Sequence, residues 1–436
     1  MPHGSPQKRN YQEIPSGTES AVGVSASTVL LATTSLITIG SHYNKHSLSS
    51  LGPVIIEALD LHRTKYGLLF SSQAIPGIVL PIISGIALSC LPYGPAAITL
   101  SSLIMFSTVL CAVGVMHLSY NMLIAGRFLF GLCDGALTTL QGAIIARYFR
   151  SRSGIGFGTM LLVSRLSSST GLTLPAYIFD LYGLNIAMWF SVLLCIPPFL
   201  ATVAYARLTT DSVVPPMAPS IHLLMSMLRR LTVPFWLVAY DWLVVASVVF
   251  TLLHFAPDAF KASFGWSPLH AGLLSGGMVL YAGVTSPLFG VLQDRTGRRG
   301  YILAGCCTLL LCGAVLCSLA IMPTLASATL LYAGLISVAI GFGAAPVTLM
   351  SSVALSVDDA VVPAALGVYK AVENAGMSVI HVGVGALRDS TGDYVLSFLL
   401  LAALAGTGIL ASCALSHSSR FVEHHCEVPP DVEAVE

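Results

Sequence analysis

Apolar stretches of about 20 residues recur along nearly the whole sequence, separated by short polar segments. Each stretch matches the roughly 30 Å hydrocarbon core of a bilayer, because a helix rises about 1.5 Å per residue. Apolar and polar residues do not alternate at a period of two, which disfavours a β-barrel. The pattern therefore predicts an all-α membrane protein. We expect twelve transmembrane helices at residues 24–46, 67–90, 95–117, 121–147, 155–179, 184–206, 233–255, 270–291, 301–321, 326–350, 364–386 and 394–416.

The longest polar interruption inside this array, residues 207–232, divides the helices into two groups of six. Pro215, Pro216 and Pro219 forbid a continuous helix there. The predicted organisation is a tail at 1–23, a six-helix half at 24–206, a central loop at 207–232, a six-helix half at 233–416 and a tail at 417–436.

A spacing of glycines supports two related halves. Gly158 lies 25 residues before Gly183, and Gly367 lies 25 residues before Gly392. The fifth and eleventh helices therefore correspond, as in transporters built from internal repeats, whose solute site lies at the repeat interface near the midplane.

Basic residues predict the orientation, because Lys and Arg accumulate on the cytoplasmic side of membrane proteins. One set lies on a single side if both termini are cytoplasmic: Lys8, Arg9, Arg147, Arg150, Arg152, Arg207, Arg229, Arg230, Arg295, Arg298, Arg299 and Arg420. The loops of the opposite side are expected to hold only Lys45, Arg63, Lys65, Lys261 and Arg388.

Composition excludes several classes of function. Hydrophobic residues make up 55% of the chain and charged residues 9%, whereas about a quarter of a soluble domain is charged. The net charge of zero and the lack of a basic stripe argue against a nucleic-acid partner. The ten cysteines form no C-x-x-C pair, and no phosphate-binding loop or nucleophile elbow is present. We therefore predict no enzyme activity, no metal and no cofactor.

The loop after the predicted eighth helix reads G-V-L-Q-D-R-T-G-R-R. It resembles the G-x-L-x-D-R-x-G-R-R signature of the major facilitator superfamily. A carboxylate and a guanidinium on a tight glycine turn can form a salt bridge or meet a helix end, which would gate the cytoplasmic face. In the first half, Ser89 and Cys90 stand where the family has Asp and Arg, so the motif is incomplete there. The predicted gating residues are Gly290, Asp294, Arg295, Gly297, Arg298 and Arg299.

Further short motifs are similar to the branch of this superfamily that contains the lysosomal dipeptide uniporter. They are Gly126-Arg127-Phe128, Tyr148-Phe149, Phe157-Gly158, Ser164-Arg165, Val233-Pro234, Ser286-Pro287 and Glu373-Asn374. The resemblance implies twelve helices, export of dipeptides from lysosomes and a glycosylated single-span accessory subunit. The chain has no N-x-S/T sequon of its own, which is compatible with such a partner.

Charged side chains at membrane depth usually mark a solute or proton path. By helical rise, Asp134 lies about 20 Å into the fourth helix, Arg165 about 15 Å into the fifth, and Asp241 and Glu373 about 14 Å into the seventh and eleventh. These groups and Asn374 form the predicted site for a small zwitterion such as a dipeptide. In the structural alternative, the charges pair only with one another and hold helices together.

The resemblance assigns roles within this site. It implies that Arg165 binds the peptide carboxylate, which suits a planar guanidinium. The acidic residue that holds the substrate amine in the family corresponds to Gly135, so Asp134 or Asp241 would have to replace it. Arg127 is expected to serve in packing or gating.

The leading prediction is alternating-access uniport of dipeptides across the lysosomal membrane, with the plasma membrane or another endomembrane as alternatives. Two other functions stay open: an organic-anion or monocarboxylate carrier, and a non-transporting sensor. The segment from Tyr11 to Ile14 resembles a lysosomal sorting signal. Several histidines also map to the side opposite the termini, where an acidic compartment could protonate them. They are His42, His46, His62, His117, His254, His270 and His381.

Overall fold

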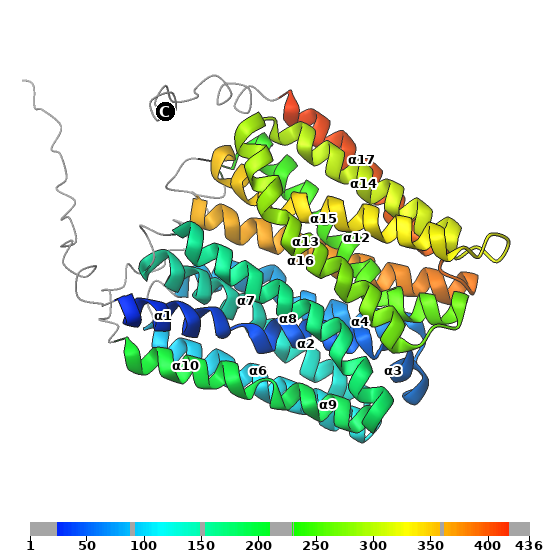
Figure 1. The fold of residues 1–436 in the computed structure, drawn as a ribbon, viewed down its shortest axis with the longest axis horizontal. Helices are drawn as coiled ribbons and strands as arrows, with labels where there is room; N and C mark the ends of the chain where they lie inside the picture. Colours follow the sequence, from blue (N-terminus) through cyan, green and yellow to red (C-terminus); the bar gives the residue numbers. More distant parts are fainter. Residues whose placement is uncertain are drawn as a thin grey trace, which may run out of the picture.

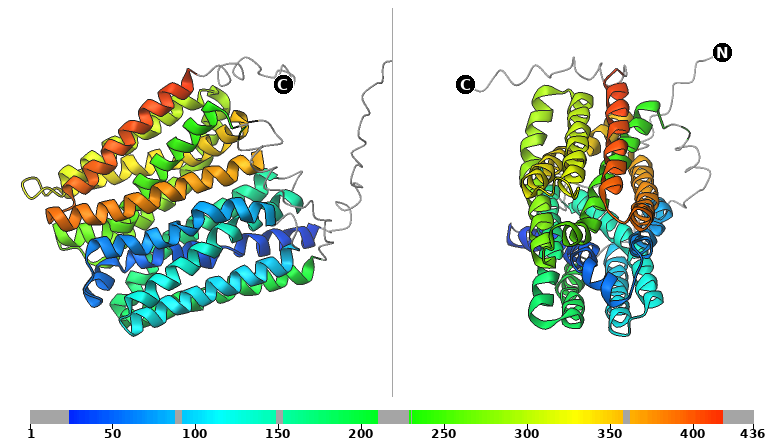
Figure 2. Two further views of the ribbon diagram at one scale, coloured as in Figure 1. Left: turned by 180° about the vertical axis from the view of Figure 1, so that it is seen from behind. Right: turned by 90° about the vertical axis from the view of Figure 1, so that its right-hand side faces the viewer.

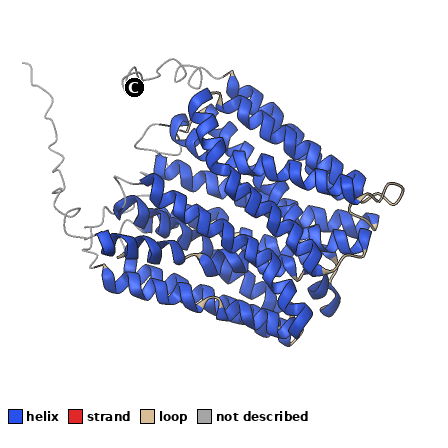
Figure 3. Cartoon of the chain, viewed as in Figure 1, coloured by secondary structure: helices blue, strands red, loops and turns tan. Residues whose placement is uncertain are grey.

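The computed structural model describes residues 24–87, 92–148, 153–209, 229, 231–357 and 362–417. In these ranges every regular element is an α-helix (Figure 3), which confirms the predicted fold class. The proposed sorting signal from Tyr11 to Ile14, both tails beyond residues 24–417 and most of the predicted central loop lie outside the described residues.

The helices of the first half of the chain form one side of the molecule, drawn from blue to green in Figure 1. They are α1 (Val24–Leu36), α2 (Ile39–Ser50), α3 (Gly52–Ala58), α4 (Arg63–Ala74), α5 (Pro76–Ala87), α6 (Tyr93–Met116), α7 (Tyr120–Tyr148), α8 (Ser153–Tyr182), α9 (Leu184–Leu193) and α10 (Ile196–Leu208).

The helices of the second half form the other side, and the views in Figure 2 keep the two groups apart. They are α12 (Val233–Phe264), α13 (Pro268–Thr296), α14 (Arg299–Ala320), α15 (Ala328–Ser356), α16 (Val362–Thr391) and α17 (Val395–Ser416). We call α1–α10 the first bundle and α12–α17 the second bundle.

The spaced glycines of the two halves have the same structure. Helices α8 and α16 are each 30 residues long, and each is followed directly by a glycine with positive φ, Gly183 at 84° and Gly392 at 83°. Glycine adopts this backbone conformation without the steric penalty that a Cβ atom brings. The repeat seen in the sequence is thus a repeat of helix length and helix ending.

Eight helices among the described residues are long and apolar enough to cross a bilayer. They are Tyr93–Met116, Tyr120–Ile145, Leu184–Leu208, Val233–Phe264, Pro268–Gln293, Arg299–Ala320, Ala328–Val353 and Val395–Ser416. The other four predicted segments correspond to α1–α3, α4–α5, α8 and α16, which are interrupted or carry more polar side chains. The count of twelve spans stays a prediction.

Large apolar side chains cover the outside of the bundle. Val233, Leu410 and Leu288 are 73%, 72% and 69% exposed. Water would disfavour so much exposed apolar surface, whereas lipid tails accept it. The interior instead holds polar groups, including Asp241 and Glu373, both 0% exposed.

The two bundles meet closely at one end of the molecule. Helix α1 begins and α17 ends at the left of Figure 1, which we call the terminal end; the opposite, distal end carries α3 and the turns at 59–62, 265–267 and 392–394. A Cβ atom on Gly67 of α4 would lie 2.3 Å from the His381 carbonyl oxygen of α16, and one on Gly385 would lie 2.3 Å from that of Arg63. Glycine therefore permits α4 and α16 to touch along their backbones.

Candidate functional site

The middle of α2 packs a polar face against α7. Ser41 donates a hydrogen bond to the Asp134 carboxylate of α7 over 2.7 Å. Lys45, one turn further along α2, interacts electrostatically with Asp134, and so does His42. Residues four apart share a helix face, which explains why Ser41 and Lys45 meet the same carboxylate. Asp134 thus points toward charged neighbours and not toward lipid.

Arg165 of α8 faces the second bundle. Its guanidinium carbon lies 4.5 Å from the centre of the Phe342 ring of α15, an arrangement typical of a cation–π contact. A Cβ atom on Gly283 of α13 would lie 2.9 Å from the Arg165 Cβ, so α8 and α13 approach closely beside this side chain. Arg165 also interacts electrostatically with Glu373 of α16. Its guanidinium therefore lies between the bundles.

Glu373 is the centre of a small network in the second bundle. Its Oε2 atom lies 2.5 Å from the Lys370 ammonium, one turn earlier on α16, and accepts a hydrogen bond from the Trp242 indole of α12 over 2.7 Å. Trp242 stacks on Tyr369, with 5.5 Å between the ring centres. Lys370 is 37% exposed, whereas Glu373 is fully buried. The network leaves the Lys370 end accessible from the space between the bundles.

Charges of the two bundles interact across their interface. Asp134 interacts with Lys370, and Lys45 interacts with both Lys370 and Glu373. Within the described part of the chain, neither Lys45 nor Arg165 has a carboxylate within 4.0 Å. Lys45 and Arg165, together with the partly exposed carboxylate of Asp134, are thus available to a ligand that carries a positive and a negative charge.

Two other residues of the predicted site have different surroundings. Asp241 of α12 is fully buried and accepts a hydrogen bond from Ser412 of α17 over 2.9 Å, so it faces the inside of the second bundle. The Asn374 amide donates to the Gly77 carbonyl of α5 and to the Lys370 carbonyl, each over 2.9 Å. Asp241 therefore lies apart from the charged groups of Asp134, Arg165 and Glu373. Asn374 joins the two bundles through its hydrogen bond to Gly77.

Arg127 of α7 is held by the first bundle. It donates to the carbonyl oxygen of Asn44 over 3.1 Å and to the Gln73 side chain, and it lies over the rings of Phe70 and Phe130. The guanidinium thus connects α2, α4 and α7. This geometry is that of a packing residue.

The motif that resembles the superfamily signature forms the turn between α13 and α14. Gly297 ends α13 with φ at 64°, and its amide donates to the Gln293 carbonyl over 2.8 Å. The Gln293 side chain donates to Ser351 of α15 over 2.8 Å, which holds the end of α13 against α15. Arg295 and Arg298 are exposed at the terminal end, Arg299 follows at the start of α14, and Gly290 lies in α13 beside Val347. The side chain of Asp294 lies outside what the structure describes.

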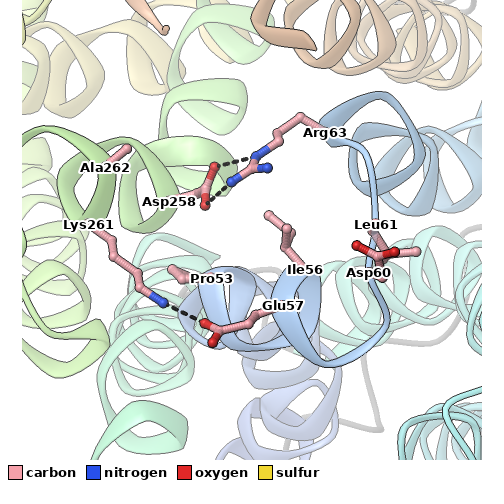
Figure 4. A pocket seen from close by; sticks show the side chains of 9 residues that line it. All are labelled: Pro53, Ile56, Glu57, Asp60, Leu61, Arg63, Asp258, Lys261 and Ala262. Atoms are coloured by element: carbon pink, nitrogen blue, oxygen red, sulfur yellow. Dashed lines mark hydrogen bonds and ion pairs between the residues drawn. The ribbon is translucent and has the colours of Figure 1, made fainter. Parts of the chain in front are cut away.

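Ion pairs join the bundles at the distal end, around a pocket of about 410 Å³ (Figure 4). Arg63 of α4 binds both carboxylate oxygens of Asp258 of α12, over 3.0 and 3.3 Å, and the Tyr394 hydroxyl donates to the same carboxylate over 2.5 Å. Glu57 of α3 accepts from Lys261 over 2.8 Å. That hydrogen bond and the Lys261 charge lower the pKa of Glu57 below its ordinary value.

A third distal contact involves Asp389 at the end of α16. Its carboxylate accepts from the backbone amides of Arg63 and Thr64 and from the Thr64 hydroxyl, over 2.9, 2.8 and 2.6 Å. These amides belong to the first turn of α4, where helix N–H groups lack partners of their own. Among the described residues, the hydrogen bonds and ion pairs between the bundles lie at this end or near mid-bundle.

Three histidines meet between the mid-bundle charges and the distal contacts. His254 of α12 and His381 of α16 have ring nitrogens 3.2 Å apart, and His254 stacks on Phe70 of α4 with 3.9 Å between ring centres. His46 of α2 lies 6.0 Å from the His254 ring. The sequence placed these histidines toward this side but gave no sign that three of them touch.

Lys45, Lys370 and Trp242 belong to this charge network but were not among the predicted site residues. Lys45 was expected in the last turn of the first helix, predicted at 24–46, and was counted with the loops opposite the termini. The structure instead continues helically through α2 and α3 to Ala58, which places Lys45 deeper in the bundle. The available signal was the spacing of Ser41, Lys45 and Ser49, which places polar side chains on one helix face. Trp242 gave no signal beyond its position next to Asp241.

A family model identifies the fold to which this site belongs. The model described as Major Facilitator Superfamily matches residues 31–381 and, in a second match, residues 243–425. Together they cover most of the chain. The chain belongs to the Major Facilitator Superfamily. It is therefore a multi-pass membrane transporter of this superfamily, which confirms the family inferred from the loop motif.

Curated relatives agree with the branch inferred from the short motifs. The chain is 21% identical over 389 residues to the lysosomal dipeptide transporter MFSD1 of Homo sapiens, covering 84% of this chain and 81% of that one. It is 20% identical over 408 residues to the protein of the same name from Mus musculus, covering 88% and 85%. The branch of the superfamily is thereby confirmed.

Solved structures share the fold at low identity. The nucleoside transporter NupG superposes with a TM-score of 0.71 at 13% identity, covering 88% of this chain and 99% of that chain. A bacterial homologue of the human lysosomal transporter Spinster, in an inward-facing and unoccupied conformation, gives 0.65 at 14% identity, covering 91% and 95%. A superfamily transporter of this kind carries a small-molecule solute through the membrane.

Proposed function

We propose that this chain carries dipeptides, or zwitterions of similar size, by alternating access and as a uniporter. The observation that carries this proposal is the meeting of opposite charges from both bundles at mid-bundle. Arg165 of the first bundle interacts with Glu373 of the second, and Asp134 of the first interacts with Lys370 of the second. A ligand with a carboxylate and an amine would contact both bundles at once.

The roles follow from the partners that each group lacks. The Arg165 guanidinium rests on the Phe342 ring and keeps its N–H groups for a peptide carboxylate, which it can bind through two parallel hydrogen bonds. Asp134 uses one oxygen for Ser41, so its second oxygen is available for the peptide amine. Glu373 is engaged by Lys370 and Trp242 and would set the position of the Lys370 charge.

Alternating access is supported by the placement of the contacts between the bundles. The ion pairs of Arg63 and Lys261 close the distal end, and no described hydrogen bond or ion pair joins the bundles at the terminal end. Exposed Arg207, Arg295 and Arg298 lie at that end. We assign the terminal end to the cytoplasm and the distal end to the lumen.

Lysosomal location and an accessory subunit belong to the same proposal. The named activity of the relatives and the Tyr11–Ile14 segment favour the lysosomal membrane. The lack of an N-x-S/T sequon is compatible with a glycosylated partner that shields the lumenal face. Unchanged location of a Tyr11→Ala variant would dismiss the sorting signal.

Uptake by proteoliposomes tests the transport proposal. The purified full chain is reconstituted, and entry of radiolabelled Ala-Ala is measured beside binding, which is read as a rise in unfolding temperature because the ligand stabilises the folded state. Arg165→Gln and Asp134→Asn should each lower affinity at least tenfold, since each removes a charged hydrogen-bond partner. Arg207→Gln and Asp180→Asn, at exposed positions, are the matched controls.

The same assay separates the alternatives. A monocarboxylate carrier would take up lactate and keep its affinity in Asp134→Asn, whereas a dipeptide carrier would not. A chain that binds dipeptides without moving them would be a sensor. Absence of both binding and uptake of any dipeptide contradicts the proposal.

A further inference from the structure

The mid-bundle site holds more positive than negative charge. Lys45, Arg165 and Lys370 are partly exposed there, and among the described residues two carboxylates, Asp134 and Glu373, interact with them. The remaining buried charges nearby are engaged elsewhere in the described structure. Asp241 accepts a hydrogen bond from Ser412 of α17, and Arg127 donates hydrogen bonds to backbone carbonyls of α2 and to Gln73.

A neutral dipeptide would leave this excess in place. Its carboxylate would offset Arg165 and its amine would occupy Asp134, while Glu373 stays with Lys370 over 2.5 Å. Lys45 would then share Asp134 with the peptide amine and Glu373 with Lys370, and it would have no carboxylate of its own. Its ammonium lies 4.9 Å from the centre of the Phe250 ring. A cation desolvated at this depth without an anionic partner is unfavourable.

We infer that the site prefers dipeptides with a second carboxylate, supplied by an aspartate or glutamate side chain, and that Lys45 binds that carboxylate. This inference rests on the proposed dipeptide transport and names its substrate class. Lys45 projects from α2 toward Phe250 of α12, so an acidic side chain at this point would lie between the bundles. Basic dipeptides would add a cation beside Lys45 and Lys370 and would bind worst.

Competition in proteoliposomes tests the preference. Uptake of labelled Ala-Ala is inhibited by unlabelled Ala-Asp, Ala-Ala or Ala-Lys at equal pH and ionic strength. The acidic dipeptide should compete about tenfold better than the neutral one, the factor that corresponds to about 1.4 kcal/mol. Ala-Lys should compete less well than Ala-Ala.

Lys45 variants assign the preference to one residue. Uptake by the Lys45→Gln variant should be inhibited equally by Ala-Asp and by Ala-Ala, because the extra cation is gone. The Lys45→Arg variant should keep the preference for Ala-Asp. Lys65→Gln, at an exposed lysine over the Tyr120 ring near the distal end, is the matched control and should behave as the parent chain.

The outcomes are distinguishable. If Ala-Ala is transported and Ala-Asp competes no better, the charge inference is overturned and dipeptide transport stands. If the preference persists in Lys45→Gln, the assignment to Lys45 is overturned. If no dipeptide is bound or transported, the proposed function and this inference fail together. The parent chain alone decides the first point even if Lys45→Gln does not fold.

Discussion

Asp241 and Trp242 are adjacent in sequence yet meet different helices. Trp242 donates to Glu373 of α16, whereas Asp241 accepts from Ser412 of α17. Neighbours on a helix project about 100° apart, so equal depth in the membrane does not imply a shared site. The sequence predicts how deep Asp241 lies in the membrane. The packing of α12 decides which helix its side chain faces.

Replacement of Asp241 by asparagine should therefore spare ligand binding. Asparagine keeps the shape and can still accept from Ser412, and it removes a fully buried carboxylate that has no cation within ion-pair distance in the described structure. We expect dipeptide affinity within about twofold of the parent chain and an equal or higher unfolding temperature. A tenfold loss of affinity in Asp241→Asn, comparable to that of Asp134→Asn, would contradict this reading.

Lys45 illustrates what hydropathy cannot reveal. The polar run from residue 41 to residue 50 resembles a loop when it is averaged along the chain. In the structure it is a helix, and its Ser41 hydroxyl donates a hydrogen bond to Asp134, which lies 93 positions later in the chain. The apolar spans, the repeat and Arg165 were predictable from local pattern and family resemblance, whereas these long-range pairings were not.

The backbone contact between α4 and α16 depends on a missing side chain. A Cβ atom at Gly67 would lie 2.3 Å from the His381 carbonyl oxygen, so Gly67→Ala must push the two helices apart. Overpacking of this kind costs about 1–3 kcal/mol and should disfavour the distally closed state. We expect greater labelling by an impermeant maleimide, applied from the distal side, of a Leu61→Cys reporter, which is 6% exposed in this state.

Gly277→Ala is the control for that substitution, because no atom lies within 4 Å of a Cβ atom at Gly277. It should leave the labelling of the reporter unchanged. Equal labelling in the Gly67→Ala and Gly277→Ala variants would mean that the close approach of α4 and α16 does not hold the distal end closed.

The two distal ion pairs should differ in importance. Asp258 is 5% exposed and Arg63 30%, whereas Lys261 and Glu57 are 43% and 76% exposed. Arg63→Gln would leave the Asp258 carboxylate buried without its cation, at a cost of about 2 kcal/mol, the low end for such pairs. It should increase labelling of the Leu61→Cys reporter severalfold. Lys261→Gln, in a solvent-exposed pair, should change the labelling little. A reversed order of the two variants would contradict this ranking.

For the molecule as a whole, titration of the exposed Glu57–Lys261 pair should not open the distal end in mild acid. The Lys261 hydrogen bond and charge lower the pKa of Glu57. A carboxylate with a lowered pKa in the folded state contributes its stabilisation at and above its ordinary pKa of about 4.3, and that contribution is lost only as the pH falls through the lowered value. The Glu57–Lys261 pair should thus stay intact at about pH 5.

Reporter labelling against pH checks this expectation. The labelled fraction of Leu61→Cys, corrected for thiol reactivity with an unfolded control, should stay level from about pH 7.5 to pH 5. A rise in that interval would show that other groups govern closure, and the contact of His46, His254 and His381 would be the first place to look.

The pairing of Lys370 with Glu373 on one helix has an energetic consequence for the empty carrier. The helix α16 neutralises its own buried carboxylate, and Arg165 rests on an aromatic ring. In the proposed uniport, the vacant site reorients with these pairings kept and with Lys45 as its one excess cation, and no proton or sodium ion is bound on the return. A transport cycle in which no coupling ion moves has no source of work. In the proposed uniport the solute would therefore move only down its own gradient, and net flow would stop once its chemical potential was equal in both compartments.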